Sequence, residues 1–98
     1  MTIEIKRNAE ETTIKLVGRL DTITAPALDK TISEDITGTK NLVLDVKELE
    51  YISSAGLRVL LGAQKKMQKI GSMKVTNVRE EVMEVFEMTG FADILVIE

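Results

Sequence analysis

Apolar and polar positions alternate along the first part of the chain, which is a pattern typical of β-strands. Isoleucine or leucine occupies alternate positions of the run 2–7, and again of the run 12–17. A period of two residues places such side chains on one face of a sheet. The polar segment 8–11 between the runs predicts a β-hairpin, and Gly18 is expected to end the second strand.

Three later segments repeat apolar residues at the three- and four-residue spacing of amphipathic helices. The first begins near Thr24, which can cap it, and Pro26 fits its first turn. Gly38 closes this segment. The main helix is predicted over 54–70 and a third helix over 80–88. We expect the buried stripe of the main helix to comprise Val59, Leu60, Ala63, Met67 and Ile70.

The remaining apolar runs predict two more strands and a short final one. The run 41–46 is almost continuously apolar, which is typical of a strand covered on both faces. The run 73–78 alternates, and 94–97 is a short strand or an extended tail. Helices then alternate with strands after the hairpin, which favours parallel pairing. The chain is therefore expected to form one α/β domain, 1–98, with a mixed β-sheet, an N-terminal hairpin, central parallel strands and about three helices.

Composition narrows the possible chemistry. The chain has a net charge of −3 and contains neither Cys nor His. We therefore expect no disulfide, no Cys/His metal site and no His-dependent catalysis. The net charge disfavours nucleic-acid binding, and no apolar run is long enough to span a bilayer. No nucleotide-binding glycine motif is present, so no cofactor is expected, and the alternating start of the chain predicts a cytoplasmic protein without a signal peptide.

The candidate chemistry lies after the third strand. Asp45 is expected to end that strand, and Ser53 and Ser54 stand at the start of the apolar main helix. We call residues 53–56 the serine turn. Unpaired N–H groups at the positive end of a helix dipole favour a phosphate there. Gly56 costs about 1 kcal/mol relative to Ala inside a helix, so it indicates close approach of another group to the backbone. The alternative is a serine that only caps the helix.

Three segments carry further motifs, in order along the chain. They are Gly18-Arg19-Leu20-Asp21, Asp45 to Gly62 with Ser53-Ser54-Ala55-Gly56-Leu57, and Phe86-Glu87-Met88-Thr89-Gly90-Phe91-Ala92-Asp93-Ile94. Together they resemble STAS domains and, more narrowly, bacterial anti-sigma factor antagonists. The family's usual turn is Asp-Ser-Ser/Thr-Gly, in which the first Ser accepts phosphate. With Gly56 in register, the resemblance implies that Ser54 is the phosphoacceptor, Ser53 replaces the Asp and is a rival acceptor, and Ala55 takes the Ser/Thr position.

The resemblance also implies a partner-switching role. The unphosphorylated protein would bind an anti-sigma factor, which is a serine kinase, and so release a sigma factor for transcription. The kinase would phosphorylate Ser54, and a serine phosphatase would restore the hydroxyl. Asp21, Asp45 and Glu48 are candidates for carboxylates beside the phosphate, where like charges repel. The chain would be a substrate and not an enzyme, because it contains no His and its serine turn contains no Lys that could act as a base for Ser54. The alternative is a STAS scaffold or sensory-complex module that does not act on a sigma factor.

One exposed face of the main helix is a candidate docking surface. Residues at helical spacing along it are Arg58, Gly62, Lys65 and Lys69. Such a face can be merely solvated. The resemblance favours docking, with Gly62 allowing close approach and the basic side chains facing an acidic patch. The predicted partner-binding residues are Ser53, Ser54, Ala55, Arg58, Gly62 and Lys65.

Overall fold

The computed structural model describes residues 1–98, with the exception of the Asp35 side chain. The strands are β1 (Thr2–Asn8), β2 (Glu11–Leu20), β3 (Asn41–Ile52) and β4 (Ser72–Thr76). The helices are α1 (Ala25–Asp35), α2 (Ser54–Ile70) and α3 (Glu80–Thr89), followed by a 3₁₀ turn, η1 (Phe91–Asp93). Among the helices described, none has the length and apolar character needed to cross a membrane.

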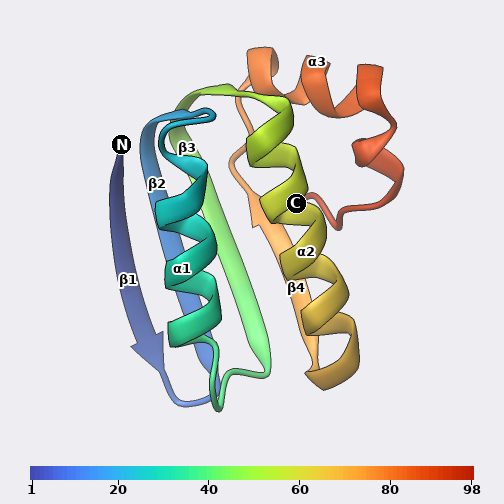
Figure 1. Ribbon diagram of the computed structural model, residues 1–98. Coiled ribbons are helices and arrows are strands. Elements are labelled where there is room, and N and C mark those ends of the chain that lie inside the picture. Colours follow the sequence, from blue (N-terminus) through green and yellow to red (C-terminus); the bar gives the residue numbers. More distant parts are fainter.

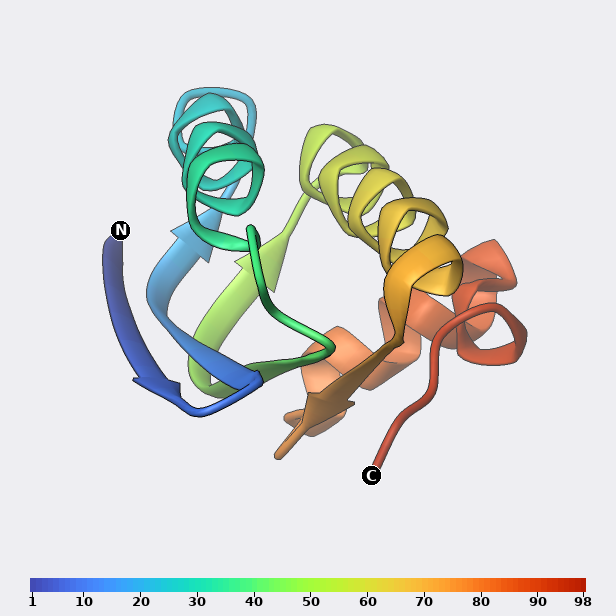
Figure 2. The ribbon, with the colours of Figure 1, turned by 90° about the horizontal axis from the view of Figure 1, so that it is seen from below.

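The four strands form one sheet in the order β1-β2-β3-β4. β1 and β2 pair antiparallel, whereas β2, β3 and β4 run parallel to one another. Helices α1 and α2 lie side by side over one face of this sheet, as Figure 2 shows from the end of the molecule. Helix α3 runs crosswise to α2 near the far end of β4 (Figure 1). The predicted fold class, with its hairpin, parallel strands and three helices, is confirmed.

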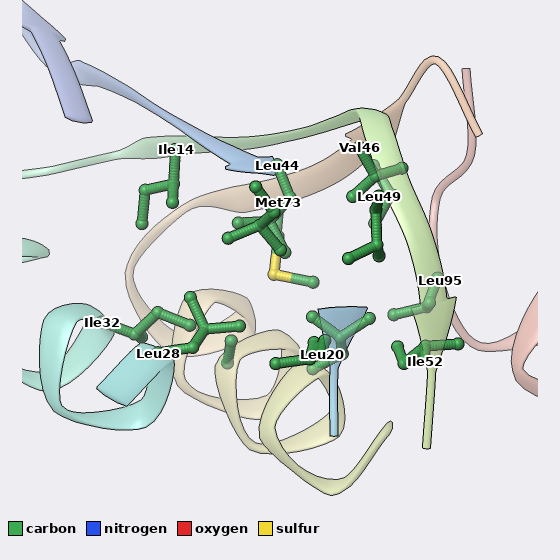
Figure 3. Packing of buried hydrophobic residues seen from close by; sticks show 14 of the residues in the cluster. Ile14, Leu20, Leu28, Ile32, Leu44, Val46, Leu49, Ile52, Met73 and Leu95 are labelled. Carbon is green, nitrogen blue, oxygen red and sulfur yellow. The ribbon is translucent and has the colours of Figure 1, made fainter. Parts of the chain in front are cut away.

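The core fills the space between the sheet and the two covering helices (Figure 3). Ile14 and Leu44 point into it from β2 and β3, and Leu28 and Ile32 reach it from α1. All four are at most 1% exposed. Nearly all of this core is aliphatic, and Phe86 of α3 is its fully buried aromatic side chain. Each such side chain contributes roughly 1.5–3 kcal/mol through burial.

β3 is longer than the apolar run 41–46 predicts. It continues to Ile52, and both Leu49 and Ile52 are buried. Two irregularities in its register with β2 absorb the extra residues of β3 and shift the inward-facing positions out of simple alternation. The expectation that Gly18 ends β2 is wrong. Gly18 lies within β2 at one of these irregularities with φ +107°, a conformation that glycine adopts without strain.

Two differences from the predicted pattern lie at the ends of elements. Most of the predicted stripe of α2 is buried, but Ile70, at the edge of the stripe and the last residue of the helix, is 50% exposed. The final segment makes a single parallel bridge between Ile97 and Val75, with Leu95 buried in the core beside it. Residues 94–97 therefore form the extended tail, which one bridge ties to the edge of the sheet.

The sheet face opposite α1 and α2 is open and polar. A shallow hollow of about 330 Å³ on it is lined by Glu4, Ile5, Lys6, Thr13, Lys15 and Asp45. No residue of the serine turn lines this hollow. The hollow and the serine turn are therefore separate features of the molecule.

Candidate functional site

The turns that follow β2 and β3 lie next to each other at one end of the strands (Figure 1). Leu20 and Ile52 are register partners at the ends of the two parallel strands. The N–H of Ser53 donates to the carbonyl of Leu20 at 2.9 Å, which joins the two turns directly. Asp21 and Ser53 thus begin neighbouring turns, as the resemblance implied for Asp21.

The two serines of the turn have different roles in the structure. Ser53 is extended (φ −98°, ψ 175°) and caps α2, and its hydroxyl accepts the N–H of Gly56 at 3.4 Å. Ser54 is the first residue of α2 and is exposed. Its hydroxyl makes no hydrogen bond within the part of the chain that the structure describes. The capping alternative therefore holds for Ser53, while the hydroxyl of Ser54 remains accessible to a modifying enzyme.

The electrostatic surroundings of Ser54 favour a negative group. No acidic residue stands in the first turn of α2, so the positive end of the helix is not neutralised by its own side chains. Arg58 follows Ser54 by four residues, on the same face of the helix, and is exposed. An anion at a helix N-terminus gains about 0.3–1 kcal/mol. A phosphate on Ser54 is thus compatible with the folded chain.

Gly56 explains how α2 is held against the sheet. A Cβ at this position would lie 2.7 Å from Cγ of Leu20 and 2.9 Å from Cγ1 of Ile52. The sequence indicated that some group approaches this backbone closely. In the structure, the approaching groups are the buried side chains of Leu20 and Ile52 at the ends of β2 and β3. Gly56 itself is buried. Its role is to let the first turn of α2 reach the strand ends.

Asp21 closes the turn between β2 and α1. Its Oδ1 accepts the N–H of Ile23 at 3.0 Å and the N–H of Thr24 at 3.1 Å. These bonds, chiefly that from the Thr24 N–H, hold the pKa of Asp21 below its ordinary value. Thr24 stands at the N-cap position of α1 but makes no side-chain cap bond, so the expected cap is absent. Its hydroxyl instead donates to the carbonyl of Arg19 at 2.8 Å.

Asp45 does not belong to the site, which corrects the prediction from the sequence. It lies inside β3, and the seven residues from there to Ile52 span roughly 20 Å of strand. Its carboxylate accepts the side-chain N–H of Asn77 at 3.1 Å. Glu48 is also engaged elsewhere, in a 2.6 Å ion pair with Lys15. The physical reason is that β3 continues through Asp45 where a turn was expected.

An exposed apolar side chain that the sequence analysis missed lies beside the serine turn. Ile23, in the turn after β2, is 87% exposed. Nearby, at the strand ends, the guanidinium of Arg19 stacks on the ring of Tyr51, 4.3 Å from its centroid. The available signal was an isoleucine within the polar run Asp21-Thr22-Ile23-Thr24, outside any helical stripe. Single exposed apolar side chains are common on protein surfaces, so Ile23 becomes a docking candidate only through its place in the turn that adjoins the serine turn.

The predicted docking face of α2 is exposed at its basic residues and half-buried at Gly62. Arg58 and Lys65 are exposed, and an added Cβ at Gly62 would meet no heavy atom within 4 Å. Ala55 is half-buried against the core. Lys66, outside this face, is bonded to Ser33 of α1 at 3.2 Å. The face is therefore continuous with Ser54, and its role in partner binding stays a prediction.

Substituting alanine at two glycines of α2 tests the close approach. Gly56→Ala should lower the free energy of unfolding by up to about 2 kcal/mol net, because overpacking costs about 1–3 kcal/mol and helix propensity returns about 1. Gly62→Ala, in open space, should raise it by up to about 1 kcal/mol. Urea denaturation measures both. A Gly56→Ala protein stabilised as much as the Gly62→Ala protein would contradict the packing described.

The turn bonds of Asp21 predict a pH dependence. Because folding lowers the pKa of this carboxyl, its contribution to stability is present above the ordinary value of 3.8 and is lost as pH falls through the folded-state value. The stability difference between wild type and Asp21→Asn should therefore shrink below pH 3.8. An NMR titration should place the Asp21 midpoint below 3.8, and a midpoint at or above that value would be contrary to the turn bonds.

Known proteins share this fold and sequence. The STAS domain family matches residues 2–98. The anti-sigma-B factor antagonist of Bacillus subtilis is 29% identical over 94 residues, which is 95% of this chain and 86% of that protein. Solved structures also share the fold, among them the following two. An anti-sigma factor antagonist from Mycobacterium paratuberculosis has a TM-score of 0.88 at 23% identity, covering 98% of this chain and 83% of that one. The phosphorylated Bacillus cell fate determinant SpoIIAA has a TM-score of 0.78 at 19% identity, covering 99% and 91%. With almost its whole length matched, the chain belongs to the STAS domain family.

Proposed function

We propose that this protein is an anti-sigma factor antagonist whose partner binding is switched by phosphorylation of Ser54. The observation that carries the proposal is the difference between the two serines. The Ser53 hydroxyl is used as a helix cap, whereas the Ser54 hydroxyl is exposed at the positive end of α2. Support comes from relatives named as anti-sigma factor antagonists and from a solved fold neighbour in a phosphorylated form.

The docking surface combines the start of α2 with the turn after β2. Its exposed basic groups are Arg58 and Lys65, and its exposed apolar group is Ile23. In the unphosphorylated protein, a partner covers the neutral hydroxyl of Ser54 at little electrostatic cost. Ile23 enters an apolar recess of the partner, and the basic side chains face its acidic groups.

Phosphorylation changes the partner interface more than the domain itself. A phosphoserine carries about −1.5 to −2 charge, and covering it without matched donors costs desolvation. Within the chain, the N-terminus of α2 and Arg58 accommodate the same charge. A coupling of about 3 kcal/mol would reduce partner affinity by roughly 150-fold. The switch therefore needs no rearrangement of the fold.

The proposal names two partners. An anti-sigma factor with serine kinase activity binds the free hydroxyl form and transfers phosphate to Ser54, and a serine phosphatase removes it. The chain acts as their substrate, not as an enzyme. Release of the sigma factor follows from competition, because the anti-sigma factor cannot hold both proteins through one surface.

A second candidate function rests on the residue at position 53. The family's usual turn has an Asp where this chain has Ser53, so any contact that an anti-sigma kinase makes to that carboxylate is absent here. A STAS module in a sensory complex would share the fold and the docking surface without acting on a sigma factor. Binding to an anti-sigma factor separates the two functions.

Phosphate incorporation by the kinase tests the acceptor. The purified chain, incubated with the anti-sigma kinase and ATP, should carry one phosphate on Ser54 by mass spectrometry. Ser54→Ala should abolish incorporation. Ser53→Ala is the matched control and should still be phosphorylated, although loss of the cap costs it about 1 kcal/mol of stability. Phosphate found on Ser53 in the Ser54→Ala protein would reassign the acceptor.

A charged substitution tests the switch itself. Ser54→Asp should weaken binding to the anti-sigma factor at least tenfold in calorimetry, because it places a carboxylate in an interface built for a hydroxyl. Its urea midpoint should equal that of the wild type, since the helix N-terminus tolerates the charge. Unchanged affinity would refute the switch.

Ile23 supplies a test of the docking surface. Ile23→Ser should weaken binding about tenfold, because a buried apolar anchor is lost, while the free energy of unfolding stays the same for a side chain 87% exposed. Met88→Ser is the matched control, since Met88 is also 87% exposed but lies at the end of α3. Equal effects of both variants on partner affinity would count against the assigned surface.

A further inference from the structure

The outer edge of the sheet offers a second interaction surface. β1 is the first strand in the sheet order and, among the elements that the structure describes, pairs with β2 alone. Figure 2 shows it at the margin of the sheet, away from α1 and α2. Alternate residues of an edge strand direct unpaired N–H and C=O groups outward, ready to bond another strand. Ile5, near the centre of β1, is 42% exposed.

The sequence of β1 is self-complementary about Ile5. In an antiparallel pair of two β1 strands with Ile5 opposite its own copy, Glu4 of each strand lies opposite Lys6 of the other. Directly opposed side chains share one face of a sheet, so both ion pairs form on the open face. The two Ile5 side chains meet on the face that carries the helices, where Ile5 of β1 partners Ile14 of β2.

The charges select this register over its neighbours. Centring the pair on Glu4 would oppose two glutamates, and centring it on Lys6 would oppose two lysines, both of which are unfavourable. A shift by one residue would place Glu4 opposite Ile5 and turn the two helical layers to opposite faces. Only the Ile5-centred arrangement pairs every charge of Glu4 and Lys6 and keeps the helices on one side.

We propose that β1 pairs antiparallel with β1 of a second copy of this chain, giving a symmetric dimer with one continuous sheet and a two-fold axis at Ile5. This surface is separate from the serine turn, which follows β2 and β3, so both copies keep their docking surfaces free. The proposal does not depend on the proposed function. A two-strand contact is small, and we expect a dissociation constant on the order of 0.1 mM.

Sedimentation velocity over roughly 10 μM to 1 mM protein tests the dimer, a range that brackets the expected dissociation constant. The wild-type sedimentation coefficient should rise with concentration toward that of a dimer. Glu4→Lys alone and Lys6→Glu alone should each remain monomeric, because each opposes like charges across the axis. An equimolar mixture of these two variants should associate again, because every cross-pair then joins a lysine to a glutamate.

Matched controls separate the register from general charge effects. Lys30→Glu on α1 and Glu87→Lys on α3 make the same charge changes on other exposed surfaces and should dimerise like the wild type. Circular dichroism should confirm folding. Of the two variants, Lys6→Glu disturbs the pairing of β1 with β2 less. Lys6 lies opposite the uncharged Thr13, whereas Glu4→Lys places a lysine opposite Lys15.

Three results would overturn the proposal. The first is a wild-type protein that stays monomeric at 1 mM. In that case the charge of Lys6 would serve to prevent the pairing of β1 with another strand. The second is a single variant that associates as strongly as the wild type. The third is a mixture of the two variants that remains monomeric.

Discussion

The contact between the first turn of α2 and the ends of β2 and β3 determines the geometry of the whole candidate site. Gly56 lacks the Cβ that would collide with Leu20 and Ile52, so the helix backbone rests on these side chains. The same contact places Ser53 where its N–H reaches the carbonyl of Leu20. The capping position of one serine and the exposure of the other both follow from it. Core packing and the accessible hydroxyl are therefore parts of one arrangement.

Much of the fold could be predicted because the local spacing of apolar residues indicates which segments form helices and which form strands. The limits of α2, predicted as 54–70, agree with Ser54–Ile70 in the structure. The path of β3 could not be predicted in the same way. Its later inward residues, Leu49 and Ile52, follow irregular register with β2, so their spacing resembles a turn and not a strand. The misplacement of Asp45 is a direct result of that irregularity.

The sequence located the serine turn but could not assign the roles of its two serines. A serine before an apolar helix is compatible both with a cap and with a reactive group, and sequence position alone does not separate them. Only the backbone conformation of Ser53, with its bond to Gly56, assigns the cap to one residue. The exposure of Ile23 depends likewise on the turn that Asp21 closes, which places this isoleucine in solvent and outside the stripe of α1.

The order of strands in the sheet follows their order in the chain, and this has a consequence for how the protein forms. Each strand pairs with the strand that precedes it in sequence, either through a tight hairpin or across one helix. No segment has to wait for a distant one, so little loop entropy is lost before contacts are gained. Pairing between segments that are close in sequence therefore favours rapid folding of the domain as one unit.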